Sequence, residues 1–479
     1  MDDRYDLAVI GGGAAGLVGA LVAAGLGAKV VLIEADEQPG GDCLHTGCVP
    51  SKSLLAAAQR AHDIRTAGAL GVHSSEPTVN FTEVMAHVRR AIARAGERDA
   101  PERLESEGVE VLRATARFEA PGVIVADGRT LRFQAALIAT GARPVLVPVP
   151  GLVDVAPLTT ETVWDLEALP ARLAILGAGP VGLELGQAFA RLGSKVAIAE
   201  AADRPLPAEE PEAGMLLERL LTDEGVAIHT GAPAERVERL AAGGGRLVFG
   251  GGRPAIEFDR LLCATGRAPS TERLGLESVG VTLTDRGHVR VDKHLRTTGR
   301  RIWAAGDVTG QLGFTHVAGY HGALAAVNAL LRLRRSVDLK AVPRVTFTDP
   351  EVASVGLSES QARDQLRLEP VVLRHDYAES DRAITQGGLP GFAKLVVTSR
   401  GRVVGATIAA HAAGETVAEV AALVRDGTRA GSFARTVHAY PTFSEAPVRA
   451  AGEWARRRAT PQTRRRLAPV LRLLGTAAR

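Results

Sequence analysis

The chain has 479 residues, of which 46% are hydrophobic and 23% are charged, and its net charge is +3. This length is too great for one hydrophobic core, so two to four domains are expected. The small net charge argues against a nucleic-acid binder, and three cysteines are too few for a secreted disulfide framework. The acidic start of the chain lacks the positive segment of a secretory signal, so a cytoplasmic location is expected.

The N-terminal segment has the pattern of a strand, a glycine turn, a helix and a second strand. In such a unit the glycines allow a tight turn, a close approach of a pyrophosphate and close packing of helix on strand. The helix N-terminus binds the phosphates, and an acid at the end of the second strand binds a ribose. The residues concerned are Leu7–Ile10, Gly11, Gly13, Gly16, Val30–Ile33 and Glu34.

The same pattern recurs farther along the chain, with the same gap from the last glycine to the acid. An apolar run ending in Thr-Gly follows each copy, at Thr140-Gly141 and at Thr265-Gly266. One glycine fingerprint is a weak signal, but two with matching acids favour two dinucleotide-binding domains over ordinary glycine-rich turns. The second copy comprises Leu173–Leu176, Gly177, Gly179, Gly182 and Glu200.

Two cysteines, Cys43 and Cys48, follow the first dinucleotide-binding pattern. Pro50 suits the first turn of a helix, whose dipole would favour a thiolate at Cys48. Residues five apart in a regular helix lie about 7.5 Å apart along its axis, so Cys43 to Gly47 must be non-helical if the cysteines pair. The alternative is two inert, buried cysteines, which their placement argues against. Cys263 lies in an apolar strand and is expected to be inert.

The organisation predicted from these patterns is α/β, with two Rossmann-like dinucleotide-binding domains and a C-terminal α+β domain. A proline-rich crossing ends the first part, and Phe392–Val397 and Val403–Ala406 read as strands around a turn. The expected boundaries are residues 1–150 and 271–340 for an FAD-binding domain, 151–270 for an NAD(P)-binding domain, 341–455 for the α+β domain and 456–479 for a basic tail.

The chain resembles the pyridine nucleotide–disulfide oxidoreductases, the family of dihydrolipoamide dehydrogenase, glutathione reductase and mercuric reductase. The resemblance covers nearly the whole chain to about Trp454. It is carried by both glycine fingerprints, the run from Cys43 to Lys52, Ala305–Asp307 and Tyr440–Glu445. The Gly-Asp-Cys opening and the run Phe314–Gly319 are most similar to the mercuric-reductase-like branch. The family resemblance also implies that the α+β domain, residues 341–455, is a dimerisation domain.

The resemblance implies a role for each matched position. Cys48 would lie nearest the flavin as the charge-transfer thiolate, and Cys43 would be the interchange thiol that meets the acceptor. Lys52 would sit beside the flavin and pair with Glu184, and Asp307 would hold the ribityl chain. No resident metal site is expected. The positions expected to bind FAD or the nicotinamide nucleotide are Gly11, Gly13, Gly16, Glu34, Gly41, Lys52, Ala116, Gly141, Asp307, Ala318, Gly177, Gly179, Gly182, Glu184, Glu200 and Gly266.

The C-terminal motif departs from the disulfide-reducing relatives. Those relatives carry a His before Pro-Thr and a Glu five positions later, supplied by the partner subunit as an acid–base. Here Tyr440 occupies the His position and Glu445 is retained. A tyrosine is a poor proton shuttle at neutral pH but can donate a hydrogen bond or line a metal site. His438 is a candidate to replace the missing His, or an ordinary surface histidine.

The expected function is a homodimeric FAD enzyme that passes hydride from NADH through flavin to the Cys43–Cys48 pair. The final acceptor would be a disulfide, a metal ion or a small electrophile, as in a mercuric-reductase-like enzyme; mercuric reductases also carry a C-terminal cysteine pair, which this chain lacks. The alternatives are a dihydrolipoamide dehydrogenase and an FAD-binding redox sensor without useful turnover. Glu200 favours NADH over NADPH because a carboxylate would repel the 2′-phosphate, although Arg204 could turn toward it.

The tail carries two arginine triplets and apolar residues. A basic amphipathic helix can lie on an anionic membrane surface, but such a segment more often packs its leucines on its own protein, which is the favoured expectation. The residues are Arg456–Arg458, Arg464–Arg466, Val470, Leu471, Leu473 and Leu474.

Overall fold

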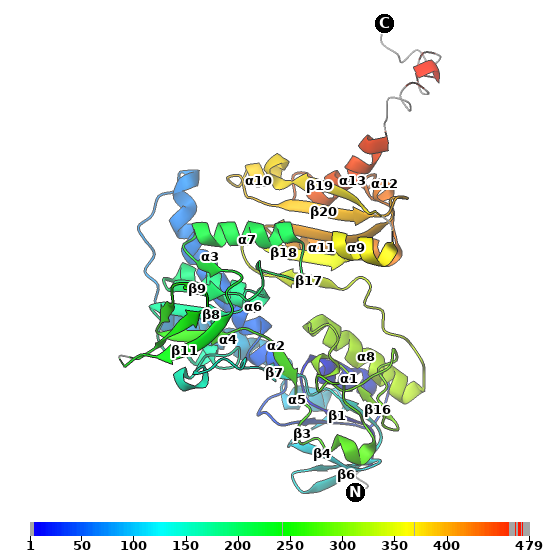
Figure 1. The fold of residues 1–479 in the computed structure, drawn as a ribbon. Coiled ribbons are helices and arrows are strands. Elements are labelled where there is room, and N and C mark those ends of the chain that lie inside the picture. The colour runs from blue at the N-terminus through cyan, green and yellow to red at the C-terminus, as the bar shows by residue number, and fades with distance from the viewer. Residues whose placement is uncertain are drawn as a thin grey trace. The chain divides into compact units, whose positions relative to one another are not determined.

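The computed structural model describes residues 4–241, 243–367 and 369–458, together with residues 465, 468–470 and 472. The chain divides into two compact units (Figure 1). The first unit comprises Met1–Arg65, Ser75–Ala201 and Glu224–Asp338; the second comprises Thr66–Ser74, Ala202–Asp223 and Leu339–Arg479.

The largest sheet of the first unit has seven strands. Its path is β3-β2-β1-β6-β5-β4, and β16 pairs in parallel with the C-terminal half of β6. A strand from far along the chain therefore completes the sheet that the N-terminus begins. The strands are β1 (Arg4–Ile10), β2 (Val30–Glu34), β3 (Val109–Arg113), β4 (Ala116–Ala120), β5 (Val123–Ala126), β6 (Arg129–Ile138) and β16 (Ile302–Ala304).

Alternation along these strands divides their side chains between two cores. In β1, Leu7 and Val9 pack with α1 and α8 on one face, while Ala8 and Ile10 pack on the other face with side chains of β4 to β6. Burial on both faces explains why Leu7–Ile10 reads as a continuous apolar run. The helices of this part are α1 (Ala14–Gly25), α2 (Gly41–His45), α3 (Cys48–Thr66), α4 (Phe81–Gly96), α5 (Pro101–Ser106) and α8 (Thr315–Leu331).

A second parallel sheet, ordered β10-β9-β8-β14, repeats the arrangement of the first around α6. A three-stranded antiparallel sheet of β11, β12 and β13 packs with it in a shared core, and β7 pairs with β15. The elements are β7 (Ala142–Pro144), β8 (Arg172–Leu176), α6 (Pro180–Leu192), β9 (Lys195–Ala199), β10 (Ala227–His229), β11 (Ala234–Arg239), β12 (Gly245–Phe249), β13 (Ile256–Phe258), β14 (Arg260–Cys263) and β15 (Arg267–Pro269).

The second unit is built on a five-stranded antiparallel sheet ordered β17-β18-β21-β20-β19. Side chains of α11, α12 and α13 pack with those of the sheet in one core. The elements are α7 (Pro211–Asp223), β17 (Pro343–Thr346), β18 (Glu351–Gly356), α9 (Glu359–Leu366), β19 (Val371–Asp376), the 3-10 turn η6 (Tyr377–Glu379), α10 (Asp381–Ile384), β20 (Phe392–Val397), β21 (Val403–Ala410), α11 (Ala413–Asp426), α12 (Ala430–Phe433) and α13 (Glu445–Arg458).

The architecture confirms the predicted fold class. Both glycine fingerprints lie between a strand and a helix, and the C-terminal strands form an α+β unit. Among the described residues, no helix is both long and apolar enough to span a bilayer. Arg456–Arg458 are exposed at the end of α13, whereas Arg464, Arg466, Leu471, Leu473 and Leu474 lie outside the described residues, so the role of the tail stays a prediction.

Candidate active site

The two glycine fingerprints adopt the same geometry for the same steric reasons. Gly11 has a φ of 99°, and a Cβ there would lie 2.5 Å from the Ala139 carbonyl oxygen. A Cβ on Gly16 would lie 1.8 Å from the Gly11 carbonyl oxygen, so only glycine lets α1 pack so closely on β1. Gly177 and Gly182 repeat these contacts in the second copy, and Gly13 and Gly179 are the N-cap residues of α1 and α6.

The two predicted ribose acids also occupy matching positions. Glu34 ends β2 and accepts a hydrogen bond from the Gly12 amide at 2.5 Å. Glu200 follows β9 and accepts one from the Ala178 amide at 2.7 Å. Each carboxylate therefore lies beside its own glycine turn, where a nucleotide pyrophosphate would approach the helix N-terminus.

Two adjoining cavities run from Glu34 to the cysteines. The outer cavity, of about 360 Å³, is lined by Glu34, Ala116 and other residues of the first unit. The inner cavity, of about 190 Å³, is lined by Cys43, Cys48 and Asp307 among others. Both cavities are lined by Gly13, Asp42, Ala139 and Gly141. This continuous space, with an acid at one end and thiols at the other, fits a bound flavin dinucleotide.

Cys43 and Cys48 are brought together by a break between two helices. Cys43 lies in α2, and Cys48 is the first residue of α3; only Thr46 and Gly47 separate the helices. With both cysteines as free thiols, Cys43 to His45 are helical, and the two-residue break redirects the chain between them; a non-helical run is expected only for a paired disulfide. Both residues are free thiols, and they hydrogen-bond each other.

The two thiols differ in acidity although they touch. The hydrogen bond from Cys43 stabilises a thiolate at Cys48 against the effect of burial, and Thr315 and the charge of Lys52 add to it. These interactions lower the pKa of Cys48 to about 6. The same bond to Cys48, followed by burial, raises the pKa of Cys43. At neutral pH Cys48 is therefore the thiolate of the pair and Cys43 the protonated partner.

Thr315 and Lys52 approach Cys48 from two helices. The Thr315 hydroxyl, on the first residue of α8, lies 3.5 Å from the Cys48 Sγ atom. Lys52, one turn along α3, donates to the Glu184 carboxylate at 2.8 Å. Glu184 lies on α6 and is 5% exposed, so a buried carboxylate holds the ammonium in place. The structure thus joins the two residues that the resemblance paired.

Asp307 and Arg267 line the inner cavity near the cysteines. Asp307 follows β16, and burial raises the pKa of its carboxyl although the Arg267 charge opposes this effect. Arg267 begins β15 and donates to the Asp42 carboxylate and to the Ala142 carbonyl. The guanidinium is therefore fixed at the wall of the cavity, where it can balance a phosphate or carboxylate.

The remaining predicted cofactor positions lie on these walls or beside them. Gly41 approaches Gly13 so closely that a Cβ on it would lie 2.7 Å from the Gly13 Cα atom. Ala318 lines the inner cavity on α8. Gly266 immediately precedes Arg267 and has a φ of 133°.

The C-terminal motif lies in the second unit. The Tyr440 side chain is 64% exposed, and its hydroxyl donates to the Asp381 carboxylate. One Glu445 oxygen accepts from Arg449 at 2.8 Å, while the other is buried with no hydrogen-bond partner. Glu445 is therefore paired with an arginine, and the tyrosine is held by a different acid.

His438 contacts hydrogen-bond acceptors at both ring nitrogens. Nε2 lies 2.9 Å from a Glu419 carboxylate oxygen, and Nδ1 lies 3.0 Å from the Thr436 carbonyl oxygen. Burial disfavours the charged ring, but these two hydrogen bonds outweigh it and raise the pKa of His438. The imidazole therefore needs both protons to satisfy its partners.

Arg204 is held by hydrogen bonds within its own loop, and Cys263 is buried. The Arg204 guanidinium donates to the carbonyls of Leu206, Pro207 and Glu209, which belong to its own loop. Cys263 is buried in β14, where burial raises its pKa to about 11. A buried thiol of this kind is unreactive.

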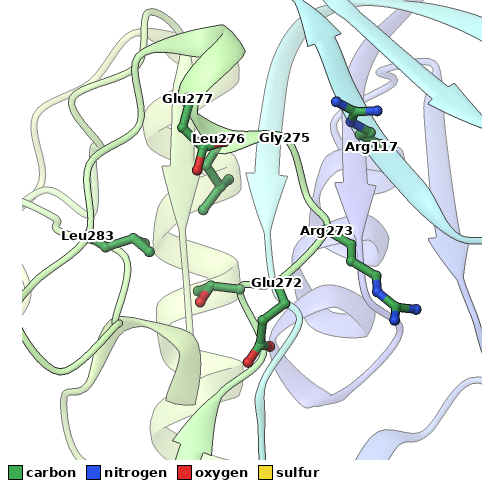
Figure 2. Close-up of a pocket in the computed structure, with 8 residues that line it drawn as sticks. Arg117, Glu272, Arg273, Gly275, Leu276, Glu277 and Leu283 are labelled. Carbon is green, nitrogen blue, oxygen red and sulfur yellow. The ribbon is translucent and has the colours of Figure 1, made fainter.

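A further pocket of about 520 Å³ in the first unit contains none of the predicted site residues (Figure 2). Its charges are of both signs, and Figure 2 shows Arg117 and Arg273 pointing away from each other. We therefore assign it no part in the site. Its lining residues are Arg117, Thr271, Glu272, Arg273, Gly275, Leu276, Glu277 and Leu283.

The sequence analysis missed two residues that the structure brings to the cysteines. Arg267 follows Thr265-Gly266 directly, so the shared Thr-Gly signal could have indicated it. Thr315 lies within Phe314–Gly319, a run used only to identify a branch of the family. In both cases the contact joins segments more than 200 residues apart, which spacing along the chain does not reveal.

Comparison with known proteins agrees with this geometry. Residues 5–322 match the family Pyridine nucleotide-disulphide oxidoreductase, and residues 342–451 match its dimerisation domain. The chain is 38% identical to the mercuric reductase of Streptomyces lividans, covering 92% of this chain and 94% of that protein. It is 35% identical to the dihydrolipoyl dehydrogenase of Bacillus subtilis (strain 168), covering 93% of this chain and 95% of that protein.

Solved structures give the same result. The HOCl-induced flavoprotein disulfide reductase RclA from Escherichia coli matches with a TM-score of 0.84 and 28% identity, covering 94% of this chain and 99% of that one. LpdA from Mycobacterium tuberculosis matches with a TM-score of 0.85 and 30% identity, with the same coverage. The predicted use of flavin and a pyridine nucleotide is confirmed, and the dimerisation domain supports a homodimer. The chain belongs to the pyridine nucleotide–disulfide oxidoreductase family and is an enzyme of that family.

Proposed function

We propose that the chain uses FAD and NADH to reduce an acceptor through the Cys43–Cys48 pair. The observation that carries this proposal is the pair of hydrogen-bonded thiols of opposite acidity at the inner end of two adjoining cavities that run from Glu34 to the cysteines. Bound FAD would take hydride from NADH and pass the electron pair to the Cys43–Cys48 disulfide. Glu34 would bind the ribose of the adenosine half, and Asp307 the ribityl chain.

The two cysteines would then divide the outward chemistry. The Cys43 thiol attacks one sulfur of an acceptor disulfide and gives its proton to the departing sulfur, forming a mixed disulfide and releasing one thiol. The Cys48 thiolate attacks the Cys43 sulfur, which releases the second thiolate and restores the Cys43–Cys48 disulfide. Lys52 stabilises the Cys48 thiolate, and Glu184 keeps the ammonium in position.

The acceptor side would be completed by the motif of the partner subunit, with Tyr440 exposed and available to meet Cys43. His438 stays a candidate proton carrier, although both of its nitrogens are engaged. A small-molecule acceptor is proposed: a disulfide, a metal cation or another electrophile. RclA, one of the structural neighbours, has been solved as a Cu(II) complex, which favours a metal cation among these choices.

NADH is proposed over NADPH. Glu200 is fixed at the glycine turn, where it would bind ribose hydroxyls and repel a 2′-phosphate. Arg204 would have to give up its hydrogen bonds to three carbonyls before it could bind that phosphate. The reducing chemistry and the small number of cysteines favour a cytoplasmic location.

Turnover by cysteine variants tests the proposal. Cys43→Ser should retain flavin and its reduction by NADH but lose thiol-dependent turnover, whereas Cys48→Ser should also lose the thiolate–flavin absorbance. Cys263→Ser is the matched control and should behave as wild type. Full activity of Cys43→Ser with every thiol-dependent acceptor would refute the mechanism.

Subunit mixing tests the shared site. Cys43→Ser and an inactive Glu445 variant should partly restore activity when they form heterodimers, because one intact site combines the two chains. Absence of rescue, with subunit exchange verified, would count against a motif supplied by the partner.

A further inference from the structure

The C-terminal motif Tyr440–Glu445, which is proposed to face the acceptor, is held by one short segment of the second unit. The segment Tyr377–Ile384, formed by η6 and α10, contacts the motif at three points. The buried Tyr377 hydroxyl donates to the Phe443 carbonyl at 2.8 Å. The Arg382 guanidinium carbon lies 5.7 Å from the centre of the Phe443 ring. The third contact is the hydrogen bond from the Tyr440 hydroxyl to Asp381.

These contacts hold the motif at two residues, Phe443 and Tyr440. Tyr377 and Arg382 hold the backbone and ring of Phe443, and Asp381 holds the far end of the Tyr440 side chain. A phenol that is 64% exposed would otherwise sample several rotamers. The segment therefore specifies where the tyrosine oxygen lies, which an exposed side chain alone would not.

The hydrogen bond to Asp381 also determines what the oxygen can offer. A neutral phenol has one proton and two lone pairs, and an ionised carboxylate can only accept. Since the proton is committed to Asp381, the lone pairs remain for an incoming group.

We propose that Asp381 is the positioning residue for Tyr440 and makes its oxygen a lone-pair donor, not an acid, toward the acceptor of the proposed reaction. An acceptor with a cationic centre is then favoured, because both the tyrosine oxygen and the aspartate charge attract it. The Tyr440 oxygen assists the reduction of an organic disulfide less, because the departing thiolate needs a proton and the Tyr440 proton is already donated to Asp381.

The charges around Tyr440 agree with this assignment. Its hydrogen bond to Asp381 and the charge of that residue raise the pKa of Tyr440, and Glu445 acts in the same direction. Arg449 opposes them. Removal of the Asp381 charge should therefore lower the pKa of Tyr440.

Ultraviolet difference titration of the holoenzyme tests this inference directly. The chain has only four tyrosines, so the titration of Tyr440 is the difference between each protein and its Tyr440→Phe counterpart. Asp381→Asn should lower the pKa of Tyr440, and Asp381→Glu, which keeps the charge, should hold it near the wild-type value. Asp426→Asn is the matched control, since Asp426 is an exposed aspartate paired with Arg425 in the same unit.

A turnover measurement in the same variants tests the role in the reaction. The rise of kcat/KM for a metal cation that accompanies ionisation of Tyr440, with Hg(II) and Cu(II) as probes, should move to lower pH by the same amount as the Tyr440 titration in Asp381→Asn, because the phenolate is the stronger lone-pair donor. An identical Tyr440 titration in wild type and Asp381→Asn would overturn the inference, as would a shifted titration with an unmoved turnover profile.

The Tyr440 titration and the turnover measurement together distinguish a failure of this inference from a failure of the proposed function on which it rests. If wild type reduced no acceptor through its cysteines, the proposed function would fail. The role of Asp381 in the reaction would fail with it, whatever the titration showed.

Discussion

Removal of the Thr315 hydroxyl should weaken the thiolate at Cys48. The hydroxyl is 3.5 Å from the Cys48 Sγ atom and is one of three contributions that lower the pKa of Cys48 to about 6. A thiol with this pKa is about nine-tenths ionised at pH 7. Loss of one hydrogen bond to the charged form should raise the pKa of Cys48 by about 1, so that about half of the thiol is ionised in Thr315→Ala.

The assay is the long-wavelength thiolate–flavin absorbance of the anaerobically reduced enzyme as a function of pH. Since the lowered pKa belongs to the thiolate, the band should be complete well above pH 6 and disappear as the pH falls through the pKa. Thr315→Ala should move the midpoint up, and Thr315→Ser, which keeps a hydroxyl, should stay near wild type. Identical midpoints for wild type and Thr315→Ala would refute the role assigned to this hydroxyl.

Three further predictions concern nucleotide choice and stability. Glu200→Ala should raise kcat/KM for NADPH more than it lowers kcat/KM for NADH, and an unchanged ratio would contradict the role of the carboxylate. Lys394 is 2% exposed and lies within 3.1 Å of oxygens of three glutamates, so Lys394→Met should reduce the free energy of unfolding by about 3–5 kcal/mol, measured by denaturant titration. As a control, Arg363→Met at an exposed ion pair should reduce the free energy of unfolding by less than about 1 kcal/mol. Burial lowers the pKa of His321 to about 4, below its unfolded value of about 6.5, so unfolding takes up a proton between these values. Stability should therefore fall as the pH drops from about 6.5 to about 4, and His321→Leu should flatten this dependence in a thermal-melt series.

The fold and the inner site were predictable because local patterns determine them. Gly11 and Gly16 have no substitute at their positions, since a Cβ would strike backbone atoms, and the sequence shows that requirement directly. Glu34 ends a strand at the same offset as Glu200, and both acids lie at their glycine turns. Where a short-range steric rule fixes the residue type, reading the sequence was sufficient.

Contacts between distant segments were not predictable in the same way. Nothing near Cys48 indicates Thr315, and nothing near Tyr440 indicates Asp381; the fold alone brings these pairs together. Arg191, near the end of α6, is buried and paired with Glu224, a residue more than 30 positions along the chain. The partners of long polar side chains depend on the tertiary structure, which cannot be read from a single sequence.

Anaerobic titration of the holoenzyme with NADH tests the central claim most directly. The account predicts that NADH reduces the flavin and that a long-wavelength thiolate–flavin band appears as the Cys43–Cys48 disulfide opens. Cys48→Ser, measured in parallel, should show flavin reduction without the band. A flavoprotein that NADH does not reduce would be a binding protein or sensor and would contradict the account.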